Sequence, residues 1–293
     1  MNQISKLGIG TSTIASLGRS ISFKKAQLIL KTALDYDINT IDTSDTYGSG
    51  DAETLIGKII REDREKYFII SKTGMPTVNL PSFLSPINQI AKKIKVYSGF
   101  KKRFDKKYII SNIEKSLMRL KIEYLDLYLL HNLDINDIEE YKTECFEALY
   151  IIKKKGLSRF VGISSHDNNS INYIIKNIDL DYVQTNIIFN ENQKIEKLKN
   201  NFKVIVNSLL SQKIESNLEK KINDLILKYK ISINHLNIIL LMYCVFKKKV
   251  NCSLFSTKNL DHLNIIGKTY NHFKNNSLNI FDELEDILID KKY

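Results

Sequence analysis

Short apolar runs alternate along the chain with longer amphipathic segments, and this alternation predicts repeated strand–helix units. The runs are rich in Ile, Val, Leu and Tyr and carry apolar residues on both faces, which is typical of strands buried in a parallel sheet. Each run is followed by a segment with helical periodicity. Eight strands are predicted, at residues 5–13, 39–44, 67–72, 125–131, 159–165, 181–188, 202–209 and 251–257.

Eight strand–helix units without a break in composition predict an α/β protein, a single-domain (β/α)8 TIM barrel over residues 1–293. The doubly wound alternative needs a glycine-rich fingerprint after the first strand, and GIGTST at residues 8–13 lacks the third glycine. In a barrel of this kind, functional groups lie at the C-terminal ends of the strands.

One connection is longer than an ordinary strand-to-helix loop. It is an insertion at about 74–106, after the third strand, and it contains all three prolines, Pro76, Pro81 and Pro86. Its apolar residues favour a packed loop with some helix, and its basic run lies between Lys92 and Lys107. Two interpretations remain open: the segment lines a substrate mouth, or it packs on the barrel rim with its lysines exposed.

Composition narrows the class of protein. The longest apolar stretch, HLNIILLMYCVF, is shorter than the roughly 18 residues of a membrane span, and the first residues lack the pattern of a signal peptide. The three cysteines have no CxxC spacing, which argues against a disulfide framework or a metal site and predicts a reducing cytoplasm. The formal net charge of +11 suggests nucleic acid, but lysines occur on every predicted helix, so a solvated surface is favoured.

Four polar side chains follow or close three of the predicted strands. Asp42 closes the second strand with Tyr47 five residues later, Lys72 closes the third, and His131 closes the fourth. Reducing a carbonyl with a nicotinamide requires an acid that protonates the oxygen, and a tyrosine with its pKa of about 10 is a weak one. A neighbouring lysine lowers that pKa, a carboxylate keeps the lysine charged, and a histidine can orient the substrate oxygen. The set therefore predicts carbonyl–alcohol chemistry.

The segments that carry these residues resemble the aldo-keto reductase family, in its bacterial, sugar-active-like branch. IDTSDTYGSGDAETLIGK is similar to the family segment around the aspartate and tyrosine, and IISK to the one around the lysine. SLMRLKIEYLDLYLLH resembles the helix and strand that deliver the histidine, while GLSRFVGISSH and DYVQTNIIFN resemble the fifth and sixth strands. The resemblance covers nearly the whole chain and implies a (β/α)8 barrel. It also implies an NAD(P)-dependent oxidoreductase with a catalytic tetrad of Asp42, Tyr47, Lys72 and His131, in which Tyr47 is the general acid.

The resemblance further implies a dinucleotide site, with some departures from the family pattern. Ser164 and Gln184 match residues that hold the nicotinamide carboxamide, whereas Asn207 replaces a stacking aromatic ring, a loss of about 0.5–1.5 kcal/mol. His262 stands where the family has an arginine, and Lys258 favours NADP(H) over NAD(H). The implied cofactor-binding residues are Ser164, Ser165, Gln184, Asn207, Ser208, Ser256, Thr257, Lys258 and His262.

The expected substrate is a small-molecule carbonyl compound or sugar, and the basic run of the insertion suggests an anionic one. Neither nucleic acid nor a membrane is expected as a partner, and the sequence predicts neither the reaction direction nor the oligomeric state. The alternative function is a catalytically weak or non-catalytic relative that senses the cofactor or binds a partner protein, which the altered cofactor residues favour.

Overall fold

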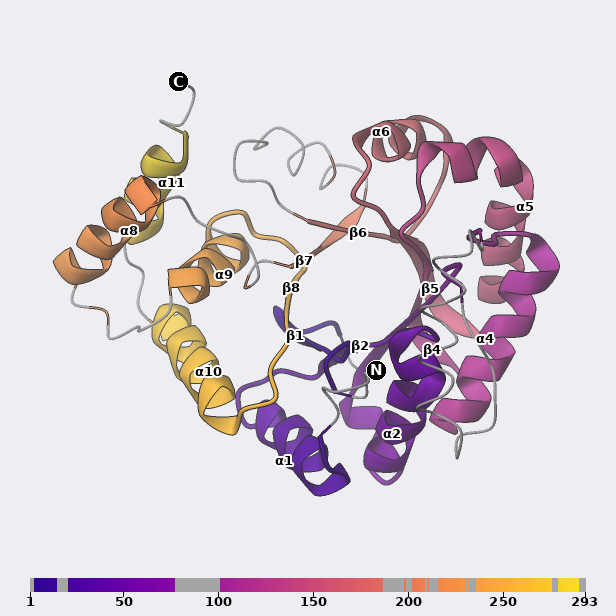
Figure 1. Cartoon of the computed structure of the whole chain (residues 1–293), viewed down its shortest axis with the longest axis horizontal. Helices are drawn as coiled ribbons and strands as arrows, with labels where there is room; N and C mark the ends of the chain where they lie inside the picture. Colours follow the sequence, from indigo (N-terminus) through magenta and orange to yellow (C-terminus); the bar gives the residue numbers. More distant parts are fainter. Residues whose placement is uncertain are drawn as a thin grey trace.

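Eight parallel strands close into a barrel in sequence order, with β1 paired to β8, so the predicted (β/α)8 fold is confirmed (Figure 1). The computed structural model describes residues 3–14, 21–76, 101–186, 198, 202–208, 210, 216–229, 231, 236–275 and 279–289. The strands are β1 (Leu7–Gly10), β2 (Thr40–Asp42), β3 (Phe68–Thr73), β4 (Leu125–His131), β5 (Ser158–Ser164), β6 (Tyr182–Asn186), β7 (Lys203–Asn207) and β8 (Cys252–Phe255).

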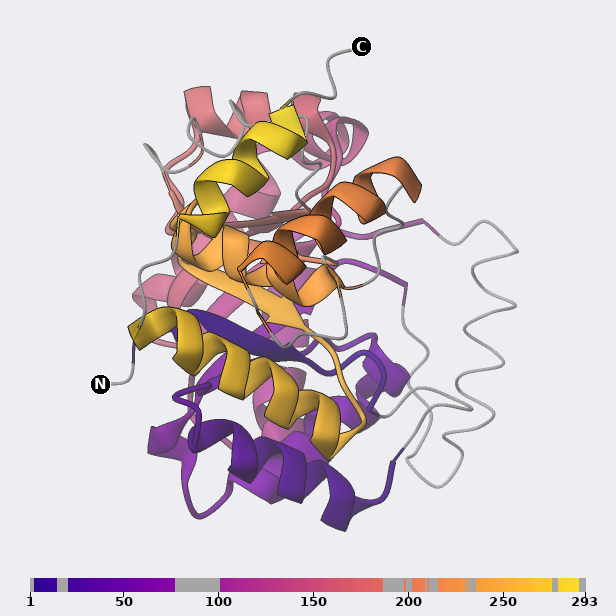
Figure 2. The ribbon, with the colours of Figure 1, turned by 90° about the vertical axis from the view of Figure 1, so that its left-hand side faces the viewer.

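Helices cover the outside of the barrel (Figures 1 and 2). They are α1 (Phe23–Leu34), α2 (Asp51–Ile60), α4 (Lys106–Leu120), α5 (Ile135–Lys154), α6 (Asn168–Asn177), α8 (Ser216–Lys228), α9 (Leu236–Phe246), α10 (Leu260–Asn275) and α11 (Ile280–Ile289), with the 3-10 helices η1 (Tyr47–Gly50) and η2 (Arg64–Lys66). The helical segment predicted after the sixth strand falls mostly outside the described residues.

The strand periodicity separates two apolar clusters. One lies between the outer face of the strands and the helices. The other is built from alternate strand residues inside the barrel: Phe68, Ile70, Leu127, Leu129, Tyr182, Ile205, Cys252 and Leu254. Because side chains alternate between the two faces of a strand, the next inward positions on β3 and β4 are Lys72 and His131. The same alternation that places apolar side chains inside the barrel therefore places polar side chains at its C-terminal mouth.

The two described ends of the predicted insertion meet at its base. The backbone N–H of Arg103 donates to the carbonyl oxygen of Gly74 at 2.9 Å. Gly74 has a φ of +119°, and a Cβ there would lie 2.0 Å from Cε1 of Phe104, so only glycine fits at this close approach. Residues 77–100 lie outside the described residues. The single-domain boundary and the role of the insertion stay predictions.

The sequence predicts neither a membrane-spanning helix nor a metal site. No helix in the described ranges has the length and apolar character to cross a membrane. The same ranges contain no group of three or more His, Cys, Asp or Glu side chains arranged to bind a metal ion.

Candidate active site

The four predicted catalytic side chains converge at one end of the barrel. β2 ends at Asp42 and β4 ends at His131, while β3 carries Lys72 next to its last residue. Tyr47 opens the short helix η1 that follows β2. Since β2, β3 and β4 are parallel neighbours, their C-terminal ends share one rim of the barrel.

Lys72 is the centre of this group. Its Nζ donates hydrogen bonds to Asp42 Oδ2 at 2.7 Å and to the carbonyl oxygen of Thr43 at 2.9 Å. The same Nζ lies 5.1 Å from the centroid of the Tyr47 ring. Lys72 is 1% exposed and Asp42 is 4% exposed. The carboxylate and the carbonyl therefore hold a buried ammonium group beside the phenol.

The pKa of the phenol differs from the sequence-based expectation. Burial raises the pKa of Tyr47, and the charge of Lys72 lowers it by less, so the net pKa lies above the ordinary value. Burial by itself lowers the pKa of Lys72, but Asp42 and Tyr47 outweigh it and the net pKa is raised. The predicted influence of the lysine on the phenol is present, yet desolvation is larger and holds the phenol protonated.

A left-handed turn fixes the position of Tyr47. Gly48, Ser49 and Gly50 have φ values of 60°, 56° and 96°. Glycine adopts this region without strain, and Gly50 is also the N-cap of α2. The YGSG segment therefore redirects the chain from β2 into α2 directly after the tyrosine.

His131 approaches the phenol from β4. Its ring centroid lies 6.0 Å from that of Tyr47, in an edge-to-face arrangement. Its Nδ1 lies 3.1 Å from Oγ of Ser44, a residue that the sequence did not single out. This contact leaves Nε2 as the ring nitrogen on the other side, so Ser44 influences which nitrogen carries the proton.

Buried acceptors beside the tetrad suit a carboxamide. Gln184 Nε2 donates to Asp42 Oδ1 at 3.0 Å, and this leaves Gln184 Oε1 buried without a hydrogen-bond partner among the described atoms. Asn186 Oδ1 and Asn207 Oδ1 are likewise buried and unsatisfied there. An amide NH2 group supplies the missing donors, so these residues fit the carboxamide end of a nicotinamide. Asn186 was missed by sequence reasoning, although it lies two residues after Gln184 on the same face of β6.

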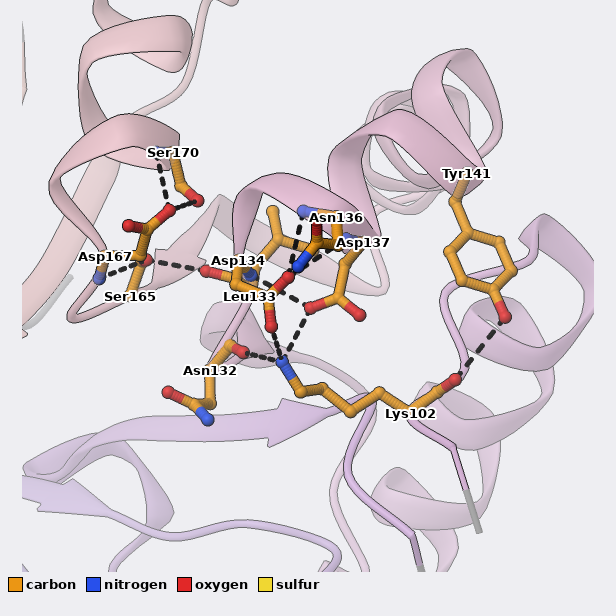
Figure 3. A network of polar contacts seen from close by, with 10 residues as sticks. All are labelled: Lys102, Asn132, Leu133, Asp134, Asn136, Asp137, Tyr141, Ser165, Asp167 and Ser170. Carbon is orange, nitrogen blue, oxygen red and sulfur yellow. Dashed lines mark hydrogen bonds and ion pairs between the residues drawn. The ribbon is translucent and has the colours of Figure 1, made fainter. Parts of the chain in front are cut away.

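Ser164, the last residue of β5, and Ser165, which follows it, lie in different surroundings. Ser164 pairs with His131 on one side and with Gln184 on the other, at the mouth of the barrel. Ser165 is completely buried, and its hydroxyl donates to the carbonyl oxygen of Leu133 at 2.6 Å (Figure 3). The hydrogen of Ser165 therefore joins β5 to the loop after His131, and the role of Ser165 at a cofactor stays a prediction.

Lys102 also binds the loop that follows His131. Its ammonium binds the carboxylates of Asp134 and Asp137 and donates to the carbonyl oxygen of Asn132 at 2.9 Å (Figure 3). Two carboxylates more than balance its charge, so Lys102 supplies no net positive charge for an anionic substrate. Lys101 is exposed, and the lysines between 92 and 95 lie outside the described residues.

The predicted phosphate contacts lie between β8 and α10. Thr257 is buried, and its hydroxyl accepts from the backbone N–H of Asn259 at 3.1 Å and lies 3.2 Å from Nδ1 of His262. Ser256 is half-buried and Lys258 is exposed, which leaves the lysine free to reach outward. Ser208 follows β7 with a φ of 62°. A phosphate would meet the N-terminal end of α10 here.

A second set of ionisable groups includes Asp45, whose charge also acts on Tyr47. Arg119 Nε donates to Glu53 Oε2 at 2.6 Å, and Glu53 is completely buried. Nearby, Thr73 donates to Asp45 Oδ2 at 2.9 Å. Burial and then the charge of Glu53 raise the pKa of Asp45 to about 7, against smaller lowering effects that include Thr73 and Arg119. Sequence reasoning missed these residues because their partners are remote along the chain.

The raised pKa of Asp45 predicts a pH-dependent stability. Because the folded pKa lies above the unfolded value of about 3.9, this contribution is present below about pH 4 and is lost as the pH rises through about 7. We expect Asp45→Asn to gain up to about 4 kcal/mol over the wild type between pH 4 and pH 8.5. Urea unfolding of both proteins across this range measures the difference, and curves that stay parallel would contradict it.

A family model matches nearly the whole chain, and curated relatives match about three fifths of it. The family model described as "Aldo/keto reductase family" matches residues 6–286. The oxidoreductase YqkF of Bacillus subtilis, itself uncharacterized, is 31% identical over 173 residues, which are 59% of this chain and 49% of YqkF. L-galactose dehydrogenase of Arabidopsis thaliana is 24% identical over 179 residues, 60% of this chain and 49% of that enzyme. The chain spans about half the length of these curated relatives.

Solved structures agree on the fold. An aldo-keto reductase from Bacillus halodurans in its holo form superposes with a TM-score of 0.72 at 20% identity, over 98% of this chain and 92% of that one. An aldo-keto reductase from Klebsiella pneumoniae in complex with NADPH gives a TM-score of 0.72 at 18% identity, over 99% and 93% of the two chains. Identity at this level supports the barrel architecture alone.

Proposed function

The chain belongs to the aldo/keto reductase family, and on that premise we propose that it is an NAD(P)H-dependent oxidoreductase. Its reaction reduces the carbonyl of an aldehyde, a ketone or a keto-sugar to an alcohol, or runs in reverse. The observation that carries the proposal is the buried Lys72 ammonium, 2.7 Å from Asp42 and 5.1 Å from the Tyr47 ring centroid. A fixed cation beside a phenol suits proton transfer, and a merely structural lysine would not need the phenol.

Each residue has a separate role in the proposed reaction. Tyr47 donates its phenolic proton to the carbonyl oxygen as negative charge develops there. Lys72 stabilises the phenolate that remains, and Asp42 keeps the ammonium charged and oriented. His131 orients the substrate oxygen by a hydrogen bond from Nε2. A reduced nicotinamide supplies the hydride when it is bound.

The unsatisfied acceptors at the mouth of the barrel support a nicotinamide site. Gln184 Oε1 and Asn207 Oδ1 would accept hydrogen bonds from the carboxamide, and Ser164 lies next to Gln184. We favour NADP(H) over NAD(H) because the exposed Lys258 can meet an additional phosphate. Asn207 offers hydrogen bonding but no aromatic stacking, which implies weaker binding than a stacked ring would give.

A fluorescence titration with NADPH and NADH tests the cofactor site. The chain has no tryptophan, so the signal comes from the reduced nicotinamide itself. Saturable binding of either dinucleotide, reversed by its oxidised form, is the expected result. Absence of binding at high protein concentration would reject the proposed oxidoreductase.

Gln184 should matter for dinucleotide affinity. Replacing Gln184 by methionine keeps the length of the side chain but removes the carboxamide acceptor and the donor to Asp42. We expect Kd for the preferred dinucleotide to rise about fivefold, because one buried hydrogen bond is worth about 1 kcal/mol. Gln27→Met on the outer helix α1 is the matched control and should leave Kd unchanged. Equal Kd values for the two variants would contradict the assignment.

The alternative is a family member that binds the dinucleotide but turns over little, as a sensor or a partner-binding protein. Asn207 in place of a stacking ring favours it. Turnover of any compound in a panel of aldehydes, ketones and sugars would count against this alternative, whereas dinucleotide binding without turnover would favour it.

A reducing, cytoplasmic location is also proposed. Cys145, Cys244 and Cys252 are all buried and unpaired. Burial raises the pKa of each thiol, to about 12 for Cys145, so the reactive thiolate is scarce near neutral pH. These cysteines act as core side chains.

A further inference from the structure

A continuous chain of hydrogen bonds leads from α4 to the ring of His131. Asn112 Nδ2 donates to Thr73 Oγ1 at 3.0 Å, and Thr73 Oγ1 is 2.9 Å from Asp45 Oδ2. Asp45 Oδ1 lies 3.2 Å from Ser44 Oγ, which in turn lies 3.1 Å from Nδ1 of His131. The four residues other than His131 are all buried, with at most 4% of their surface exposed. The chain is thus shielded from water along most of its length.

The donors at the α4 end give this chain a direction. An amide nitrogen can only donate, so Thr73 accepts from Asn112 and its own hydrogen goes to Asp45 Oδ2. A proton on Asp45 therefore belongs on Oδ1, the oxygen that faces Ser44. Ser44 then accepts from Asp45 and gives its single hydrogen to His131 Nδ1. A neutral imidazole that accepts at Nδ1 carries its proton on Nε2.

Building on the proposed function, we infer that Asp45 and Ser44 are positioning residues that set the tautomer of His131. With a proton on Asp45, Nε2 of His131 has the N–H that donates to the substrate oxygen. When Asp45 releases that proton to water, Ser44 turns its hydrogen toward Oδ1. His131 then takes a proton from water at Nδ1, which donates to Ser44 Oγ, and returns the Nε2 proton to water, so the net change is the one proton lost by Asp45. The neutral imidazole then lacks the N–H donor that faces the substrate.

The surroundings of Asp45 suit such a switch near neutral pH. Burial and the charge of Glu53 raise the pKa of Asp45 to about 7, whereas Arg119 opposes this rise. The titratable or charged groups that face Asp45 from neighbouring elements are Glu53 of α2, Tyr47 of η1, Arg119 of α4 and Tyr128 of β4. From β3, Asp45 is contacted by the Lys72 carbonyl oxygen and the Thr73 hydroxyl.

Other neighbours of Ser44 do not remove the coupling. The backbone N–H of Thr46 donates to Ser44 Oγ at 3.2 Å, which fills an acceptor position and not the hydrogen. The carbonyl oxygen of Lys72 lies 3.4 Å away, too long for a strong bond. Thr46 Oγ1, at 3.1 Å, can itself act as donor or acceptor. His131 Nδ1 and Asp45 Oδ1 thus remain good partners for the Ser44 hydroxyl.

Nitrogen NMR of the protein with ¹⁵N-labelled histidine tests the inference between pH 6 and pH 8.5. The His131 signals are assigned by their loss in His131→Gln. Within the neutral fraction of His131, we expect the Nε2–H tautomer below pH 7 and a shift towards Nδ1–H above it, with a midpoint near pH 7. Asp45→Asn should keep the Nε2–H tautomer at every pH, because its amide donates permanently to Ser44. Ser44→Ala should abolish the midpoint, and Ser44→Thr should restore it.

The pH dependence of kcat/KM is a second measurement. Relative to Asp45→Asn, the wild type should lose up to about thirtyfold in kcat/KM between pH 6 and pH 8.5. This is the fall in the protonated fraction of a group with a pKa of about 7 over that range. A single tautomer at all pH values in the wild type, or an identical response in Asp45→Asn, would overturn the inference.

The two measurements separate this inference from the proposed function. A tautomer switch in a protein without turnover would support the relay and reject the oxidoreductase. Turnover that requires Tyr47, with a His131 tautomer indifferent to Asp45 and Ser44, would support the oxidoreductase and reject the relay.

Discussion

Replacing Tyr47 by phenylalanine should lower kcat by about 10²- to 10⁴-fold, the usual contribution of a positioned general acid. The variant removes one oxygen and keeps the ring, so the packing against His131 at 6.0 Å should persist. Dinucleotide binding should be nearly unchanged, because the phenol is not among the proposed carboxamide contacts. Steady-state kinetics on a substrate found by screening, together with the fluorescence titration, provide both values.

Tyr182→Phe is the matched control for this experiment. Tyr182 is also a buried tyrosine inside the barrel, but it starts β6 and packs on Phe68 and Phe160 at the opposite end from the tetrad. It loses the same hydroxyl group and should keep kcat within about twofold. An active Tyr47→Phe enzyme would show that Tyr47 is not the acid, and an equal loss in both variants would indicate a general effect of mutation.

The fold was predictable because each buried strand is a short run of apolar residues that can be recognised in the sequence. The apolar runs at 67–72 and 125–131 coincide closely with β3 and β4, whereas the residues that face into the barrel are identified by the structure. β2 is shorter than predicted and ends at Asp42, since the chain turns there towards η1. The next turn, from Tyr47 into α2, depends on three successive residues with positive φ, which an apolar pattern does not predict.

The strand-end members of the site were predictable for the same reason, but their partners were not. Gln184 donates to Asp42 across 142 positions of sequence, and Ser44 reaches His131 across 87. These contacts arise from the closure of the barrel and the register of its strands. Neither can be predicted from a short segment of sequence. The balance between burial and Lys72 at the Tyr47 phenol likewise depends on how deeply the site is enclosed.

Arg119→Met should destabilise the folded protein by about 3–5 kcal/mol, the cost of leaving one member of a buried ion pair without its partner. The guanidinium binds Glu53, whose side chain has no exposed surface. Methionine has a similar length and can keep the stem that packs on Gly50, where a Cβ would lie 2.8 Å from Arg119 Cδ. The decrease in the free energy of unfolding should therefore come mainly from removing the guanidinium charge. Urea unfolding at pH 7 measures this decrease.

Two further variants make this prediction specific. Arg103→Met breaks a surface pair with Asp105, in which Arg103 is 59% exposed, and should cost less than about 1 kcal/mol. Combining Arg119→Met with Glu53→Gln removes the isolated carboxylate and should recover much of the lost stability. Since Gly50 ends the turn that follows Tyr47, the single Arg119 variant should also loosen that turn and reduce kcat. A stable, fully active Arg119→Met protein would show that Glu53 finds another partner and that the ion pair does not support the site.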